Sequence, residues 1–474
     1  MQEPRQRGLG TVALTALVVG AMLGSGIFSL PQNMAEGAGA GAIVIAWGIT
    51  AIGMLALTRI FQWFALNRPD LADGVYGYAR AGYGDYLGFN AAWGYWISVW
   101  VGCVGYLVVM FSALGSFADL SLFGDGSSRA ALAGGLITLW SVHALVLRGV
   151  QSAALLNTLV TVAKLVPLAL FILCVALAFR APVFGQDFWG RPQLGSVVAQ
   201  VRTTMLYTVW VFLGIECATV YAGRARDMAT VSRATLLGFL ITTVLLVCVS
   251  LLSLGVVPQP ELAAFKNPSM AGVIARAVGP WGALLVNGGL ILSVAGALLA
   301  WILIASEMLY LAARGSNHTA PAAFGRLNRR GMPANALWLT NGLISLFLIL
   351  NHLNGAGYNL LIQLASAMCL IPYLLCASFA LRLALRSPTR SGWQIGLTLL
   401  GTVYAAWLIY AGGLTFLLDS MILYAVGLLF HARARRQRGL PLFSHPADRY
   451  CAAAVVLGAV VAVVRLSTGV GAWG

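Results

Sequence analysis

Charged residues are scarce in this chain, and lysine is almost missing. Of its 474 residues only 9% are charged and 60% are hydrophobic, and the mean hydropathy is +0.86. Soluble globular proteins carry about 25% charged residues, so this composition excludes an ordinary soluble enzyme or binding module. No polar stretch is long enough to form a soluble domain. The sequence therefore predicts an all-α polytopic membrane protein.

Motifs for metal binding and for catalysis are also missing. The seven cysteines lie mostly in apolar runs without Cys-x-x-Cys or Cys/His spacing, so we expect buried thiols. None of the five histidines stands at ligand spacing from another, and no Ser/His/Asp grouping marks a catalytic site. The first apolar run is too long for a signal peptide and has no small-residue cleavage site. We expect no cofactor, no metal site and no enzymatic activity.

What the chain has instead is a series of apolar runs, each near the roughly 20 residues that cross a bilayer as a helix. We expect twelve spans, with a further run at 450–468, interrupted late by Arg465, as a thirteenth. The twelve predicted spans are 8–30, 40–65, 85–117, 130–147, 153–179, 198–222, 231–256, 279–313, 335–353, 359–384, 393–412 and 413–431.

The net charge of +15 is spread over the short loops between these runs, which argues against a nucleic-acid surface. With Arg5 and Arg7 placed on the cytoplasmic side, most arginines fall in cytoplasmic loops, as the positive-inside rule requires. The opposite loops hold only Arg129, Arg180, Arg191, Arg202, Lys266 and Arg276. We expect a multi-pass protein of the bacterial inner membrane with a cytoplasmic N-terminus, whose basic stretch 432–449 lies against anionic lipid.

The most unusual stretch is GAMLGSGIF at residues 20–28, inside the first span. Each interior glycine costs a helix about 1 kcal/mol relative to alanine, and an unwound span is tolerated only where it lines a protein cavity. Gly24-Ser25-Gly26 therefore predicts a helix break that presents backbone N–H groups to an anion, such as a substrate carboxylate. The alternative is a small-residue face for close helix packing.

Two charges lie within predicted spans, where ionisable groups are costly and usually functional. Glu216 follows a second glycine interruption, at Gly214 in the sixth span. We expect its carboxylate to take part in gating or proton coupling, and the alternative is a structural hydrogen bond between helices. Lys164 lies midway along the fifth span and either occupies the place of a sodium ion or extends to the membrane interface. Breaks in the first and sixth spans indicate a transporter whose two halves are inverted repeats.

Six aromatic residues lie near these breaks: Tyr95, Trp96, Trp100, Tyr106, Trp210 and Trp301. They are packing and interface residues, or, for Trp210 and Trp301 in the middle of their spans, rings that stack on a cationic or aliphatic side chain.

Four motifs together resemble the amino acid/polyamine/organocation superfamily, and within it the basic amino acid/polyamine antiporters. They are GAMLGSGIFSLP at 20–31, GVYGYAR at 74–80, YTVWVFLGIE at 207–216 and PANALW at 333–338. The similarity runs through the first ten spans and beyond, and looks closest to the arginine/ornithine antiporters. It implies a LeuT-type fold with 5+5 inverted repeats and alternating access. The chain would then be a single transmembrane domain, with repeats at 8–180 and 198–385, two further helices at 392–431 and the extra run at 450–468.

The resemblance also implies a role for individual residues. Met22, Ser25 and Gly26 would bind the carboxylate, and the unwound segment from Trp210 to Leu213 would bind the α-amino group. Trp210 and Trp301 would stack on the substrate side chain and gate the pocket, and Lys164 would replace sodium. The expected substrate-binding residues are Met22, Ser25, Gly26, Cys103, Tyr106, Trp210, Leu213, Trp301, Ala365 and Ser366. The expected gate or coupling residues are Tyr95, Lys164, Glu216 and Tyr373.

Two positions depart from arginine-binding relatives: Cys103 stands where they have Asn, and Ala365, beside Ser366, where they have Ser. A guanidinium has five donors to satisfy, so lysine, histidine, ornithine or a decarboxylation product stays open beside arginine. We expect an antiporter of cationic amino acids, with a proton-coupled importer as the alternative. No polar repeat suggests a channel filter. The expected partners are amino acids and membrane lipid, and the oligomeric state, monomer or homodimer, is left open.

Overall fold

The computed structural model describes residues 10–71, 73–149, 153–216, 226–314, 318–355, 357–388 and 391–468, which form helices and loops without a strand. Within these ranges ten helices are long and apolar enough to cross a membrane, or eleven when a bent pair counts as one span. The predicted all-α polytopic membrane protein is thereby confirmed, while the count of twelve or thirteen spans stays a prediction. Arg5, Arg7 and the end of the predicted span 198–222 lie outside the described residues.

The chain divides into two compact units, which are interleaved in sequence. The first comprises 1–74, 109–126 and 151–297, and the second comprises 75–108, 127–150 and 298–474. Because these boundaries differ from those of the predicted repeats, the units do not test the repeat assignment.

The first unit begins with two short helices, α1 and α2, in place of one straight span. Its helices are α1 (Thr11–Met22), α2 (Gly26–Ala35), α3 (Ala40–Asn67), η1 (Pro69–Leu71), η2 (Ala118–Phe123), α7 (Ala153–Leu177), α8 (Ala181–Gly185), η3 (Pro192–Leu194), α9 (Val197–Phe212), α11 (Met228–Leu254), α12 (Gln259–Ala263) and α13 (Ser269–Val278). It also contains the last residues of α5 (Asp85–Gly115) and the first part of α14 (Pro280–Ala313), two helices that continue into the second unit.

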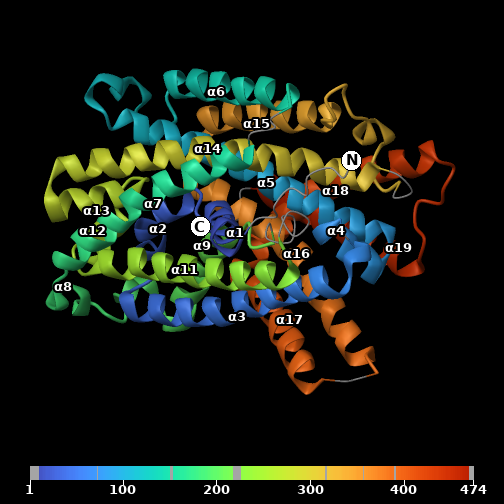
Figure 1. Cartoon of the computed structure of the whole chain (residues 1–474), viewed down its shortest axis with the longest axis horizontal. Coiled ribbons are helices and arrows are strands. Elements are labelled where there is room, and N and C mark those ends of the chain that lie inside the picture. The colour runs from blue at the N-terminus through green and yellow to red at the C-terminus, as the bar shows by residue number, and fades with distance from the viewer. Residues whose placement is uncertain are drawn as a thin grey trace, which may run out of the picture. The chain divides into compact units, whose positions relative to one another are not determined.

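The second unit holds the remaining elements, including the predicted thirteenth run as helix α19. They are α4 (Gly74–Tyr83), α6 (Arg129–Leu147), η5 (Ala322–Gly325), α15 (Ala334–Asn354), α16 (Gly357–Arg386), α17 (Gly392–Gly412), α18 (Leu414–Gln437) and α19 (Pro446–Ser467). Here α6 packs along α15, as Figure 1 shows, and α18 packs against α19.

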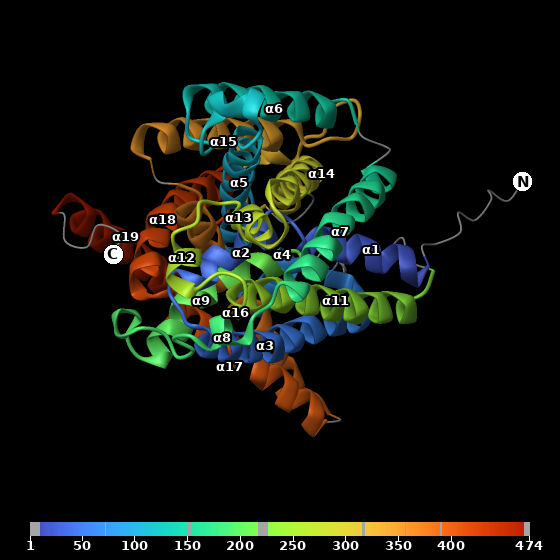
Figure 2. The same cartoon turned by 90° about the vertical axis from the view of Figure 1, so that its left-hand side faces the viewer.

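In the first unit, α1 packs against α7 and α11, and Figure 2 shows it between them. Helix α2 is enclosed by α9, α11, α12 and α13. Two hydrogen bonds connect α2 to its neighbours: Gln32 N donates to Ser269 Oγ at 3.1 Å, and Gln259 Nε2 donates to the Ala35 carbonyl at 2.6 Å. All ten residues of α2 are buried. Its position is therefore set by packing on several sides.

Arg465, the charge that interrupts the last apolar run, has a partner on the neighbouring helix. Its Nη2 donates to Asp419 Oδ1 of α18 at 2.5 Å, and the two side chains are only 17% and 8% exposed. Pairing removes much of the penalty of a charge in an apolar environment. This contact explains how α19 carries an arginine within an apolar helix.

Asp85 joins two arginines in the second unit, and its removal is expected to destabilise the fold. Its carboxylate accepts from Arg80 Nε and from Arg435 Nη1, both at 2.8 Å, and the Arg435 side chain is 5% exposed. Loss of one partner from a fully buried ion pair costs roughly 3–5 kcal/mol. Because Asp85 is 23% exposed, we expect Asp85→Ala to cost about 2 kcal/mol, seen as a lower unfolding temperature in detergent.

The matched control is Asp70→Ala, since Asp70 pairs with Arg68 on the surface with 58% of its side chain exposed. Exposed pairs contribute little to stability, so this variant should unfold at the wild-type temperature. Equal unfolding temperatures for the two variants would show that Asp85 does not stabilise the second unit.

Candidate functional site

The break predicted at Gly24-Ser25-Gly26 is present. Helix α1 ends at Met22 and α2 begins at Gly26, and α2 is bent by 45° from the axis of residues 14–22. Ser25 is the N-cap residue of α2, and its side chain forms no capping bond to that helix. The first N–H groups of a helix have no partner in its own hydrogen-bond ladder, and its dipole favours an anion there. The N-terminus of α2 therefore has the features of an anion site.

Glycine at position 26 permits the close approach of α9 to this terminus. A Cβ there would lie 2.7 Å from Cδ1 of Trp210 and 2.8 Å from Cγ1 of Val211, closer than such atoms pack. Trp210 is itself 7% exposed, so the indole has little room to withdraw. The structure thus brings together two of the predicted site residues, Gly26 and Trp210, and explains why the residue at 26 has no side chain.

Lys164 binds the other side of the break, where α1 ends. Its Nζ donates to the carbonyls of Gly20 at 2.7 Å and Leu23 at 2.5 Å, and the residue is 1% exposed. The end of a helix carries unsatisfied carbonyls and partial negative charge, which an ammonium neutralises. The alternative that Lys164 extends to the membrane interface is wrong, since its amino group is buried against α1.

Ser293 of α14 is a further residue at this end, and the sequence did not single it out. Its Oγ donates to the Leu23 carbonyl at 3.3 Å, so that carbonyl accepts from two side chains. A serine in an apolar run is common, and its sequence neighbourhood carries no distinguishing signal. Its contact with the end of α1 can be recognised only in the structure.

The predicted interruption of the sixth span is visible as the end of α9 at Phe212. Leu213 has φ −56° and ψ 133°, and Gly214 has φ +103°, a conformation that favours glycine. Glu216 is 6% exposed, and its Oε1 accepts from the Gly214 N–H at 3.3 Å. The carboxylate therefore folds back on the turn that ends α9, while residues 217–225 lie outside the described ranges.

The remaining predicted site residues belong to the second unit, and all of them are buried there. They are Tyr95, Cys103 and Tyr106 on α5, Trp301 on α14, and Ala365, Ser366 and Tyr373 on α16. Ser366 Oγ donates to the Ile362 carbonyl of its own helix at 2.8 Å. The roles assigned to these seven residues stay predictions.

Comparison with known proteins adds a second line of evidence. A family model described as amino acid permease matches residues 9–423. A Pseudomonas aeruginosa protein named arginine/ornithine antiporter is 47% identical, and the alignment covers 99% of each chain. A Chlamydia caviae protein named arginine/agmatine antiporter is 39% identical, with 91% of each chain covered.

Proposed function

Because the chain belongs to the amino acid permease family, we propose that it is a secondary transporter that exchanges cationic amino acids, arginine for ornithine, by alternating access. The observation that carries this proposal is the 47% identity, over nearly the whole of both chains, to a protein named arginine/ornithine antiporter. The break between α1 and α2 supports it, because a helix N-terminus inside an apolar fold suits a substrate carboxylate.

In this proposal the α-carboxylate binds at the N-terminus of α2, to Met22, Ser25 and Gly26, through backbone N–H groups and the Ser25 hydroxyl. The α-amino group binds backbone carbonyls between Trp210 and Leu213, where α9 ends. The close packing of Gly26 on Trp210 supports a shared role for these two segments, because it holds a donor terminus next to an acceptor terminus. An amino acid suits such an arrangement, because its carboxylate accepts from the N–H groups of α2 and its ammonium donates to the carbonyls at the end of α9.

For the second unit we propose the roles that the sequence resemblance implies. Cys103, Tyr106, Ala365 and Ser366 would contact the substrate side chain, and Trp301 would stack on it. Tyr95 and Tyr373, together with Glu216, would form a gate. A thiol and a methyl group offer few acceptors for a guanidinium, so the smaller ammonium of ornithine is the less demanding of the two proposed substrates.

We further propose the arrangement of the chain in the membrane. It comprises 5+5 inverted repeats of the LeuT type at 8–180 and 198–385, two further spans at 392–431 and α19 as a thirteenth span. The N-terminus lies in the cytoplasm of a bacterial cell and the protein in the inner membrane, in contact with anionic lipid. The excess of arginine in the loops assigned to the cytoplasm supports this orientation.

A proton-coupled amino acid importer is the second candidate, and the buried amino group of Lys164 favours it. Its side chain is 1% exposed within a predicted span, and ionisable groups at such places often take part in proton transfer. In the exchanger the same ammonium is a fixed cation that stabilises the end of α1, where a sodium-dependent carrier would bind its ion. The two candidates differ in whether transport follows a pH gradient.

The substrate is tested by competition in proteoliposomes that contain ornithine and take up labelled arginine. We expect unlabelled arginine and ornithine to reduce uptake at least tenfold when present in large excess, because both carry the carboxylate, the α-amino group and a terminal cation. Leucine has no terminal cation and serves as the control, with uptake expected to stay near its starting value. Competition by leucine as strong as that by ornithine would contradict selectivity for cationic amino acids.

A further inference from the structure

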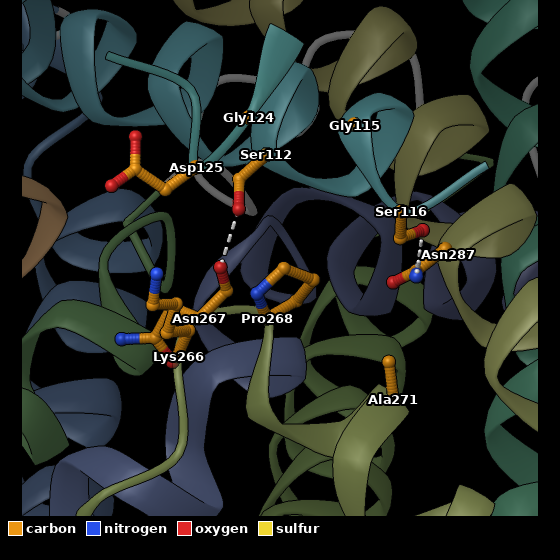
Figure 3. A pocket seen from close by; sticks show the side chains of 10 residues that line it. All are labelled: Ser112, Gly115, Ser116, Gly124, Asp125, Lys266, Asn267, Pro268, Ala271 and Asn287. Carbon is orange, nitrogen blue, oxygen red and sulfur yellow. Dashed lines mark hydrogen bonds between the residues drawn. The ribbon is translucent and has the colours of Figure 1, made fainter. Parts of the chain in front are cut away.

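A pocket of about 580 Å³ lies within the first unit, away from the α1–α2 break. Figure 3 shows its lining, which comes from the end of α5, the η2 region, the segment 266–271 and α14. Pockets that hold small molecules typically measure about 300–1,000 Å³. This one is large enough for an amino acid with accompanying water.

The pocket is lined by one charge of each sign, Asp125 and Lys266. Both residues are exposed, so a solute can reach them from the surface. The hydroxyls of Ser112 and Ser116 and the amide side chains of Asn267 and Asn287 provide further polar groups. Opposite charges in one pocket suit a zwitterion better than a simple anion or cation.

Asn287 supplies an independent indication of a ligand. The residue is 1% exposed, and its Nδ2 donates to Ser116 Oγ at 2.6 Å. Its Oδ1 is buried and accepts no hydrogen bond from the part of the chain that the structure describes. Buried polar atoms are nearly always hydrogen-bonded in folded proteins. A cationic group of a bound ligand would provide the donor that this oxygen lacks.

The pocket is connected to α2 through Asn267. Ser112 Oγ donates to the Asn267 carbonyl at 2.6 Å, and Asn267 Nδ2 donates to Gln32 Oε1 at 2.9 Å and to Asn33 Oδ1 at 3.1 Å. Asn33 lies seven residues beyond Gly26, about two helical turns along α2. A molecule in the pocket would therefore contact a segment that holds the helix at the proposed carboxylate site.

We propose that this pocket is a second amino acid subsite, which rests on the proposed function and is distinct from the site at the α1–α2 break. The carboxylate of the amino acid pairs with the Lys266 ammonium and its α-ammonium pairs with Asp125, while the cationic end of its side chain extends across the pocket and donates to Asn287 Oδ1.

The test is equilibrium binding of labelled L-arginine to the purified full chain in lipid nanodiscs, carried to saturation. We expect about two arginines per wild-type chain. Lys266→Met and Asn287→Leu should each reduce this to about one, and Ser25→Lys, at the other site, should also leave about one. Lys266→Arg keeps the positive charge, so this variant should still bind about two arginines per chain.

The matched control is Arg276→Met. Arg276 is an exposed cation of the same unit that pairs with Glu261 outside the pocket, so the variant should still bind two arginines.

A wild-type chain that binds one arginine, or a Lys266→Met chain that still binds two, would overturn the subsite. Lys266 is exposed, so its replacement tests the proposal even if the buried Asn287→Leu variant does not fold. Failure of the proposed function gives a different result, because the wild-type protein would then not exchange arginine for ornithine in proteoliposomes. If the wild-type protein exchanges arginine for ornithine but binds a single arginine, the proposed transport function holds and only the second subsite is contradicted.

Discussion

Lys164→Met is expected to reduce exchange about a hundredfold while the protein still inserts and folds. The substitution removes the donor to the carbonyls of Gly20 and Leu23, which lie at the buried end of α1. A buried acceptor left without its partner costs about 1–3 kcal/mol, and a hundredfold loss corresponds to about 2.7 kcal/mol. The measurement is the initial rate of arginine uptake into ornithine-loaded proteoliposomes, normalised to the amount of inserted protein.

Two variants make this result interpretable. Arg191→Met removes an exposed cation of the same unit, 46% exposed and paired with Asp187, and should transport at the wild-type rate. Ser293→Ala removes only the longer bond to Leu23, 3.3 Å, and should reduce the rate less than Lys164→Met does. If Lys164→Met transports as fast as Arg191→Met, the ammonium has no role in holding the end of α1.

Gly26→Ala is the second substitution with a large expected effect. The added Cβ would lie 2.7 Å from the indole of Trp210, so α2 and α9 must move apart or the ring must rotate. Overpacking of this kind typically costs about 1–3 kcal/mol. Because both segments belong to the proposed substrate site, we expect the affinity for arginine to fall at least tenfold, measured by binding to the purified protein.

The control for this prediction is another glycine of the first unit. Gly48 lies in α3, and an added Cβ would meet no atom within 4 Å. Gly48→Ala should therefore bind arginine like the wild type, and any effect on stability should be favourable because alanine is the better helix former. Wild-type affinity in Gly26→Ala would contradict the placement of the binding site beside Trp210.

The sequence predicted the break in the first span because glycine and serine act locally on the helix. Three glycines and a serine within residues 20–26 weaken a helix wherever they occur, and the structure ends α1 at Met22. Long apolar runs are equally local, which is why the predicted spans correspond to helices in the described ranges. Contacts between residues that are distant in the sequence could not be predicted in this way and are known only from the structure.

Lys164 illustrates that limit. Its charge within an apolar run marked it as functional, but its acceptors, Gly20 and Leu23, lie 144 and 141 residues earlier in the chain. Arg465 and Asp419 are similar, since each charge alone is only an interruption of an apolar run, and the packing of α18 on α19 makes them a pair. Ser293 and Asn287 lack even such a signal, because short polar side chains are common in membrane helices.

The most direct test of the exchanger is uptake of labelled arginine into proteoliposomes that contain ornithine, compared with empty vesicles under an imposed pH gradient. The proposed exchange predicts rapid uptake only with ornithine inside, and little uptake into empty vesicles at any pH gradient. Uptake into empty vesicles that follows the pH gradient would contradict exchange and assign the protein to proton-coupled import.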